Sequence, residues 1–333
     1  MDIKEVARLS GTSVATVSRV INNSGTVSPE RRARVQKVIE QTGYHPNHVG
    51  RNLRTQCSQK LLVMMPTISN PFYSDIIVSC EEHARANDYG VLLAVTNRNP
   101  QIERQYFDML YTKQVDGVLS FLPTISPQEI NRITAEYPFV ACCWRGDERI
   151  NASYVCIDNE RAAYDMVAYL VSLGHRRIAA LNGSYPGRTY EIEREAGYRK
   201  GLAHAGIPYR EEYYLKCDYS HTEAYQAADR LMHLPEPPTA IFAMSDDRAA
   251  GVIKYLWEHG YKPGVDVDVA GFDNVTVSEI TTPSITTIAQ PCAQLGKEAI
   301  LLLIARIKDP SMSNKGIILA HSLIARGSTR TIS

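Results

Sequence analysis

The sequence lacks the features of a membrane protein, a disulfide-rich secreted protein or a metalloprotein. Its longest apolar run, Ala299 to Ala305, is only seven residues, whereas a membrane-spanning helix needs roughly 18. The N-terminus has no apolar core of the kind that a signal peptide carries. None of the seven cysteines forms a C-x-x-C pair, so neither a zinc site nor a disulfide framework is expected. We therefore predict a cytoplasmic protein with reduced thiols, no metal, no cofactor and no membrane contact.

Recognisable catalytic motifs are also missing. The sequence has no G-x-S-x-G elbow, no P-loop, no G-x-G-x-x-G and no H-E-x-x-H. His175 follows a helical segment, where a structural role is expected. The acids Glu191, Glu193 and Glu195 near Arg194 are typical of a solvated helix face. We predict that the chain is not an enzyme, and an α/β enzyme is the alternative from a different class.

The net charge of the whole chain is zero, but this value is the sum of two oppositely charged parts of the sequence. The 36 Lys and Arg residues balance 36 Asp and Glu residues. Residues 1–60 hold ten of the basic residues and four of the acids, a net +6, so the remaining 273 residues carry −6. A concentrated positive charge favours phosphate. The distribution predicts a nucleic-acid-binding head attached to an acidic body.

Three short helices are predicted in this head. Gly11 ends the first helix, and Ser13 is expected to cap the second. Ser28 is expected to cap the third helix, with Pro29 at its first position and Gly43 at its end. The predicted buried side of the third helix consists of Ala33, Val35, Val38 and Ile39. Two helices joined by a tight turn that contains glycine have the helix-turn-helix plan.

The second helix has the composition of a DNA-reading helix. Its larger apolar residues recur at a spacing of three or four and face inward, which leaves small side chains and one arginine outside. Arg19 is expected to donate two hydrogen bonds to a guanine edge, while Val14 and Ala15 touch thymine methyls. Nearby hydroxyl groups are expected to hold phosphates. The candidate DNA-contacting residues of the head are Thr12, Ser13, Val14, Ala15, Thr16, Ser18, Arg19 and Ser28.

Beyond residue 60 the pattern becomes an alternation of short apolar runs and helical stretches. The predicted strands lie at 61–66, 91–95, 117–121, 139–143, 154–158, 177–183, 239–245 and 268–273. This alternation predicts an α/β body with parallel sheets covered by helices on both faces. The number of strands favours two doubly wound lobes over one open sheet. Such lobes bind ligands at the carboxyl ends of their strands and in the cleft between them.

The head resembles that of the LacI/GalR family of bacterial repressors. The matching motifs are I-K-E-V-A-R-L-S-G-T-S-V-A-T-V-S-R-V-I-N at 3–22 and T-V-S-P-E-R-R-A-R-V-Q-K-V-I-E-Q-T-G-Y-H-P-N at 26–47. The resemblance implies that Val14, Ala15 and Arg19 occupy base-reading positions. It also implies a hinge helix in P-N-H-V-G-R-N-L-R (46–54), with an apolar wedge for the minor groove. The hinge candidates for DNA contact are Asn47, Arg51 and the wedge residue Leu53.

The resemblance extends over essentially the whole chain and implies a periplasmic-binding-protein-like sensor body. N-P-F-Y at 70–73 resembles a sugar-stacking turn, and Arg194 and Asp273 match the family's ligand arginine and ligand acid. Ser245 departs from the asparagine common at its position, and Asp246 is expected to cap a helix. The effector-binding candidates are Asn70, Phe72, Tyr73, Arg188, Arg194, Tyr219, Ser245, Asp273 and Gln290. Aromatic faces with arginines, an acid and an amide suit a polyhydroxylated or planar polar ligand.

We therefore predict a sequence-specific repressor of a catabolic operon, controlled by a sugar-like effector. A nucleoside or purine effector, or a phosphocarrier protein acting as corepressor, remain alternatives. The predicted parts are a helix-turn-helix domain (1–45), a hinge (46–59), a first lobe (60–158 with 290–318) and a second lobe (159–289 with 319–333). The chain has no terminal heptads, which predicts a homodimer on a near-palindromic operator.

Overall fold

The computed structural model describes residues 1–44, 57–146, 148–183, 189–217 and 220–330. The chain divides into two compact units, Met1–Ser58 and Gln59–Ser333. The hinge candidates Asn47, Arg51 and Leu53 and the effector candidates Arg188 and Tyr219 lie outside the described residues. No helix within the described ranges is long and apolar enough to cross a membrane.

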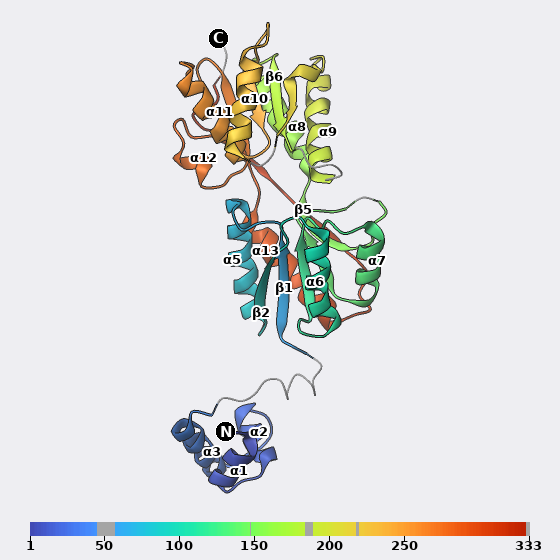
Figure 1. Cartoon of the computed structure of the whole chain (residues 1–333), viewed down its shortest axis with the longest axis vertical. Coiled ribbons are helices and arrows are strands. Elements are labelled where there is room, and N and C mark those ends of the chain that lie inside the picture. Colours follow the sequence, from blue (N-terminus) through green and yellow to red (C-terminus); the bar gives the residue numbers. More distant parts are fainter. Residues whose placement is uncertain (45–56, 147, 184–188, 218–219, 331–333) are drawn as a thin grey trace. The chain divides into compact units, whose positions relative to one another are not determined.

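Residues 1–44 of the first unit form three helices (Figure 1), which pack around a small apolar core. They are α1 (Ile3–Ser10), α2 (Val14–Ile21) and α3 (Pro29–Thr42). Gly11 ends α1 in the left-handed region, with φ of 60°, and Ser13 Oγ accepts a hydrogen bond from the Thr16 amide at 3.2 Å. Ser28 stands at the N-cap position of α3, but its side chain makes no capping hydrogen bond. The buried residues of the core are Val6, Ala7, Val17, Val20, Val35 and Tyr44.

The predicted buried side of α3 is wrong at one position. Ala33 is exposed, whereas Val35 is fully buried and Val38 and Ile39 pack against the core. Residues two apart on a helix differ in direction by about 200°, so Ala33 and Val35 cannot share a face. Tyr44, directly after the helix, fills the core instead.

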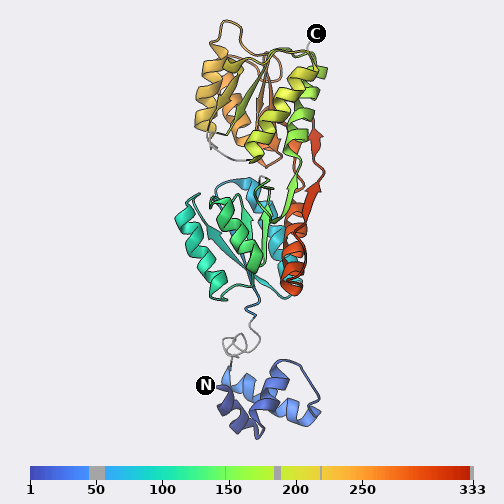
Figure 2. The ribbon, with the colours of Figure 1, turned by 90° about the vertical axis from the view of Figure 1, so that its right-hand side faces the viewer.

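The first sheet of the second unit is parallel, with strand order β11-β5-β4-β3-β1-β2. Its strands are β1 (Lys60–Met65), β2 (Gly90–Val95), β3 (Gly117–Phe121), β4 (Phe139–Cys142), β5 (Ser153–Ile157) and β11 (Gly316–Leu319). Its helices are α5 (Pro71–Arg85), α6 (Pro100–Tyr111), α7 (Pro127–Glu136) and α13 (Cys292–Lys308). Helix α5 packs against α13, and both cover the face of the sheet opposite to α6 and α7 (Figure 2).

The second sheet has the strand order β12-β10-β9-β8-β6-β7, and only β12 runs antiparallel to its neighbour among the described strands. Its strands are β6 (Ile178–Asn182), β7 (Tyr214–Lys216), β8 (Ala240–Ala243), β9 (Asp268–Asp273), β10 (Thr286–Ala289) and β12 (Ser322–Ile324). Its helices are α8 (Asn159–Ser172), α9 (Thr189–His204), α10 (His221–Met232), α11 (Asp246–Glu258), α12 (Val277–Ile280) and the 3-10 turn η1 (Glu211–Tyr213). Helix α8 packs on α9, and α10 packs on α11.

The chain passes between the two sheets three times within the described residues. It does so from β5 to α8, from β10 to α13 and from β11 to β12. Each lobe is therefore built from separated pieces of sequence. The eight predicted strands are confirmed, and the structure adds four short strands, β7, β10, β11 and β12.

Candidate functional site

The exposed side of α2 carries the predicted base-reading residues. Val17 and Val20 are buried in the head core, while Val14 is 40% exposed and Ala15 and Arg19 are exposed. Because the apolar side chain of Val14 is exposed, the fold gives up the free energy that its burial would contribute. The small residues beside one arginine leave a surface that a major groove can accommodate.

Hydroxyl groups gather around the N-terminus of α2. Thr12 Oγ1 lies 2.9 Å from Ser10 Oγ, and Ser13 Oγ lies 3.0 Å from Thr16 Oγ1. Ser18 is partly exposed, and its carbonyl oxygen accepts a hydrogen bond from Asn22 Nδ2 at 2.7 Å. The bonds of Thr12, Ser13 and Thr16 orient their hydroxyl groups beside the positive end of α2, which suits contact with phosphate. Ser28 is exposed at the start of α3.

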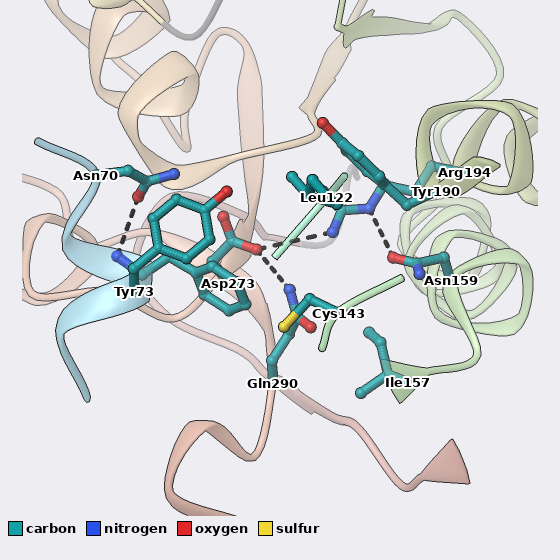
Figure 3. A pocket seen from close by; sticks show the side chains of 11 residues that line it. Asn70, Tyr73, Leu122, Cys143, Ile157, Asn159, Tyr190, Arg194, Asp273 and Gln290 are labelled. Carbon is teal, nitrogen blue, oxygen red and sulfur yellow. Dashed lines mark hydrogen bonds and ion pairs between the residues drawn. The ribbon is translucent and has the colours of Figure 1, made fainter. Parts of the chain in front are cut away.

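The second unit contains a pocket that opens to solvent and is lined at the carboxyl ends of strands from both sheets (Figure 3); the space between its lining atoms, open solvent included, is about 410 Å³. Of the predicted effector residues, it is lined by Asn70, Phe72, Tyr73, Arg194, Asp273 and Gln290. The sequence analysis missed five further lining residues, which are Leu122, Cys143, Ile157, Asn159 and Tyr190. Several of these directly follow or end predicted strands, so strand-end position is the signal that could have found them.

Arg194 and Asp273 form the charged centre of the pocket. Both are almost fully buried, and Arg194 Nη2 lies 3.8 Å from Asp273 Oδ1. Arg194 Nε donates to Asn159 Oδ1 at 2.9 Å, and Nη1 donates to the Met244 carbonyl oxygen at 2.9 Å. Its guanidinium lies 3.6 Å from the centroid of the Phe272 ring, a cation–π contact. Arg194 on α9 is therefore held rigidly at the end of β9.

Asp273 also accepts a hydrogen bond from Gln290 Nε2 at 2.7 Å, so it lies between an arginine and an amide (Figure 3). Burial raises the pKa of Asp273 to about 6, while Arg194 and the Gln290 hydrogen bond oppose this increase. The backbone of Asp273 has φ of 106°, and the lining residues Leu122 and Cys143 have φ of 54° and 60°. Left-handed conformations at such residues are costly and cluster at ligand sites.

Two candidates near the pocket have structural roles. Ser245 does not line the pocket; it is 3% exposed and caps α11, its hydroxyl accepting from the Arg248 amide. Asp246 was expected to be this cap, but it is the first helical residue and is fully buried. Its carboxyl group accepts hydrogen bonds from Thr287 Oγ1 at 2.6 Å and the Val275 amide at 2.8 Å. Asp246 therefore stabilises the turn that follows Asp273.

The acids on α9 do not form one solvated face, contrary to expectation. Glu191 is buried, and its carboxylate accepts a hydrogen bond from Tyr190 at 3.2 Å. Glu193 pairs with Arg145 at 2.6 Å, and burial raises the pKa of Glu193. His175 is structural as predicted, because it is buried and its Nε2 lies 2.8 Å from Asp268.

These features define a ligand-controlled regulator of transcription, in which a DNA-reading helical head is joined to a two-sheet sensor body. Residues 2–47 match the model of bacterial regulatory proteins of the lacI family, and residues 167–329 match a periplasmic binding protein-like domain. The transcriptional repressor CytR of Escherichia coli K12 is 35% identical over 335 residues, which cover 99% of this chain and 96% of CytR. The chain belongs to the lacI family of bacterial regulatory proteins.

Solved structures agree with this assignment. A complex of the transcriptional regulator CelR with cellobiose is 28% identical, with a TM-score of 0.74, covering 98% of this chain and 99% of CelR. The Lac repressor dimer bound to operator and the anti-inducer ONPF has a TM-score of 0.90, 24% identity and 99% coverage of both chains, and it shares the fold. These proteins are regulators of transcription rather than enzymes. The chain is a DNA-binding transcriptional repressor of this family.

Proposed function

We propose that a small sugar-like molecule binds in the pocket and controls operator binding by the head. The observation that carries this proposal is the buried pair of Arg194 and Asp273 at the strand ends, with Asn159 and Gln290 bonded to it. A fixed donor beside a fixed acceptor suits adjacent hydroxyl groups. The cellobiose bound by CelR supports the same chemistry for this chain.

A ligand in this pocket would touch elements of both lobes, so it would favour one arrangement of the lobes over others. We propose that this preference passes through the hinge at 46–59 to the head. We propose a first lobe (60–158 with 290–318) and a second lobe (159–289 with 319–333), and the three passages between the sheets support this division. The coupling is reciprocal, because a ligand that weakens DNA binding is itself bound less tightly by the DNA complex.

For the head, we propose that Arg19, Val14 and Ala15 read base edges, while Thr12, Ser13, Thr16, Ser18 and Ser28 hold phosphates. In the hinge, Asn47, Arg51 and the wedge residue Leu53 are proposed to contact the minor groove. A homodimer would place two heads on a near-palindromic operator of a catabolic operon. We propose that the protein acts without catalysis in the cytoplasm, where bacterial operator DNA lies.

Arg19→Ala tests the base-reading role. The operator is first selected from random DNA with the wild-type protein, and discrimination is then measured by gel shift. We expect the variant to lose about 10- to 100-fold in preference for the selected site, because one bidentate contact contributes about 1–3 kcal/mol. Arg34→Ala is the control, since Arg34 is an exposed arginine on α3 and should affect only general DNA affinity. Retained discrimination in Arg19→Ala would refute the role.

A thermal-shift panel of sugars, nucleosides and sugar phosphates tests the effector role. We expect at least one neutral hydroxylated compound to stabilise the second unit, since ligands that bind only the folded state raise its stability. The same panel is repeated with Asp273→Asn, which should lose the shift. A shift with a phosphocarrier protein and with none of the small molecules would contradict the effector role of the pocket.

A further inference from the structure

Building on the effector function proposed above, we propose that Arg145 and Glu193 form a charged latch between the two lobes, which sets how often the lobes lie together around the pocket. Arg145 follows β4 of the first sheet, and Glu193 lies on α9, which packs on the second sheet. Neither residue is among the described residues that line the pocket. The latch would therefore act on the pocket without contact with the effector.

The two side chains of the latch form a short ion pair in a sheltered place. Arg145 Nε donates a hydrogen bond to Glu193 Oε1 at 2.6 Å, and the side chain of Glu193 is only 12% exposed. Burial raises the pKa of Glu193, and the charge of Arg145 opposes that increase. A sheltered carboxylate is costly when its partner is removed. Glu193 is therefore better stabilised when the first lobe holds Arg145 against α9.

A second acid of the same region also attracts Arg145. Burial lowers the pKa of Arg145, but the charges of Glu193 and Asp158 outweigh this effect and raise it. Asp158 is fixed in place, because it caps α8 by accepting a hydrogen bond from the Arg161 amide at 2.9 Å. The side chain of Arg145 is 40% exposed, in a solvent-open groove that Asp158 also lines. Dissolved salt can therefore reach the latch and weaken it.

Asn159 connects the latch to the pocket. The carboxylate of Glu193 accepts a hydrogen bond from the Asn159 side chain, and Asn159 Oδ1 accepts one from Arg194 Nε at 2.9 Å (Figure 3). Asn159 thus uses one end of its amide for the latch and the other for the arginine that lies beside Asp273. Because each side chain restricts the next, the pairing of Arg145 with Glu193 also restricts the direction of Arg194.

The latch would change the populations of two lobe arrangements. The pocket is complete only when residues of both lobes meet, since Asn70 and Tyr73 line it from the first lobe and Asp273 from the second. Without the latch, a smaller fraction of molecules would have the lobes together. We expect a change of about three- to tenfold in the ratio of joined to separated lobes, because a partly exposed ion pair contributes little more than that.

Single-molecule energy transfer in the full chain tests the latch without an effector. The two dyes are attached at Gln105 on α6 and Gln226 on α10, which are both exposed. Labelled chains are mixed with an excess of unlabelled chains, so that transfer is measured within one chain. We expect Arg145→Gln to lower the ratio of joined to separated lobes at least threefold, and 1 M NaCl to lower it in the wild type.

Two further variants provide matched controls. Arg104→Gln removes an ion pair of similar geometry, in which Arg104 Nε lies 2.6 Å from Glu129 Oε1, but both partners belong to the first lobe, so the ratio should not change. The double variant Arg145→Gln, Glu193→Gln leaves no unpaired carboxylate, so its ratio should lie closer to the wild type than that of Arg145→Gln. An unchanged ratio in Arg145→Gln, or an equal decrease in Arg104→Gln, would overturn the latch.

Operator binding gives a second measurement on the same variants. By gel shift with the operator selected by the wild-type protein, we expect Arg145→Gln to change operator affinity at least threefold and Arg104→Gln to leave it unchanged, because the lobes and the head are coupled. A shifted lobe ratio with unchanged operator affinity would contradict a regulatory role of the latch. Neither measurement uses an effector, so failure of the latch is distinguishable from failure of the effector function, which the thermal-shift panel tests.

Discussion

Asp246 shows at the scale of one residue how burial couples the stability of the fold to pH. Burial is the main cause that raises the pKa of Asp246 from 3.8 to about 8, and the charge of Asp273 adds to it. The folded protein therefore keeps a proton that the unfolded chain has lost. The resulting stability is fully present below pH 4 and is lost as the pH rises through 8.

Replacing Asp246 with asparagine should remove this dependence. We expect the wild type to lose stability between pH 4 and 9, by up to about 5 kcal/mol from this group, while Asp246→Asn changes much less. Urea unfolding at several pH values measures the difference. Asp108→Asn, at an exposed position on α6, is the control and should behave like the wild type. Identical pH profiles for Asp246→Asn and the wild type would disprove the assignment.

Asp273 gives a second pH-dependent prediction. Its pKa of about 6 means that the carboxyl group takes up a proton as the pH falls below 6. Protonation removes the negative charge beside Arg194 and one acceptor for ligand hydroxyl groups. We expect effector affinity, measured by calorimetry, to fall about tenfold from pH 7.5 to pH 5. Residual binding by Asp273→Asn should not vary with pH, and a parallel decrease in that variant would assign the effect to another group.

Among the elements, the apolar strands could be predicted from sequence and the shortest strands could not. Seven of the eight predicted strands are mostly buried and apolar, as expected for parallel strands covered on both faces, and the edge strand β2 is partly exposed. The missed strands β7 and β12 have only three residues each, and a run of that length has no recognisable period. Their pairing depends on neighbours far away in the sequence.

The residues of the pocket also divide into those that the sequence identified and those that it did not. Asn70 and Asp273 could be identified because each belongs to a motif at a strand end. Leu122 and Cys143 were missed because their side chains are ordinary core types, although each lies at the end of a predicted strand, where it has a positive φ and lines the pocket. Ser245, which was predicted to bind the effector, is the helix cap that was expected at Asp246, since a one-residue shift of the helix start decides which side chain caps.

The contact between α8 and α9 depends on Gly197. A Cβ atom at this position would collide with the Glu160 carbonyl oxygen on α8 and come within 2.9 Å of Ala163 Cβ. We expect Gly197→Ala to destabilise the second unit by about 2 kcal/mol or more, because neither backbone can yield freely. Chemical denaturation measures this loss. Gly90→Ala is the control, since its nearest neighbour lies 3.9 Å away, and a neutral Gly197→Ala would contradict the close approach.

At the scale of the whole molecule, members of this family act as dimers, and one surface of the second unit suits self-association. Val78 on α5 is 67% exposed, and Leu93 on the neighbouring edge strand β2 is 52% exposed. Two neighbouring elements at this sheet edge therefore carry exposed apolar residues, which is typical of an interaction surface. We propose that this surface belongs to the dimer interface.

The double variant Val78→Glu, Leu93→Glu should weaken the dimer at least tenfold without unfolding the monomer. Sedimentation over a range of concentrations measures the dissociation constant, and operator affinity should fall with it because one head contacts only one half-site. Val265→Glu, at a position 46% exposed on the second lobe, is the control. An unchanged dimer in the double variant would place the interface elsewhere.

The three passages of the chain between the sheets determine the order in which the head, the first sheet and the pocket can be completed during translation. The core of the head is complete once Tyr44 has been made. The first sheet, in contrast, needs β11 (Gly316–Leu319), and the helix α13 that packs on α5 comes almost as late. Gln290 of the pocket also belongs to this late segment. A chain truncated before residue 290 would therefore contain the complete head but would lack part of the first sheet and of the effector pocket.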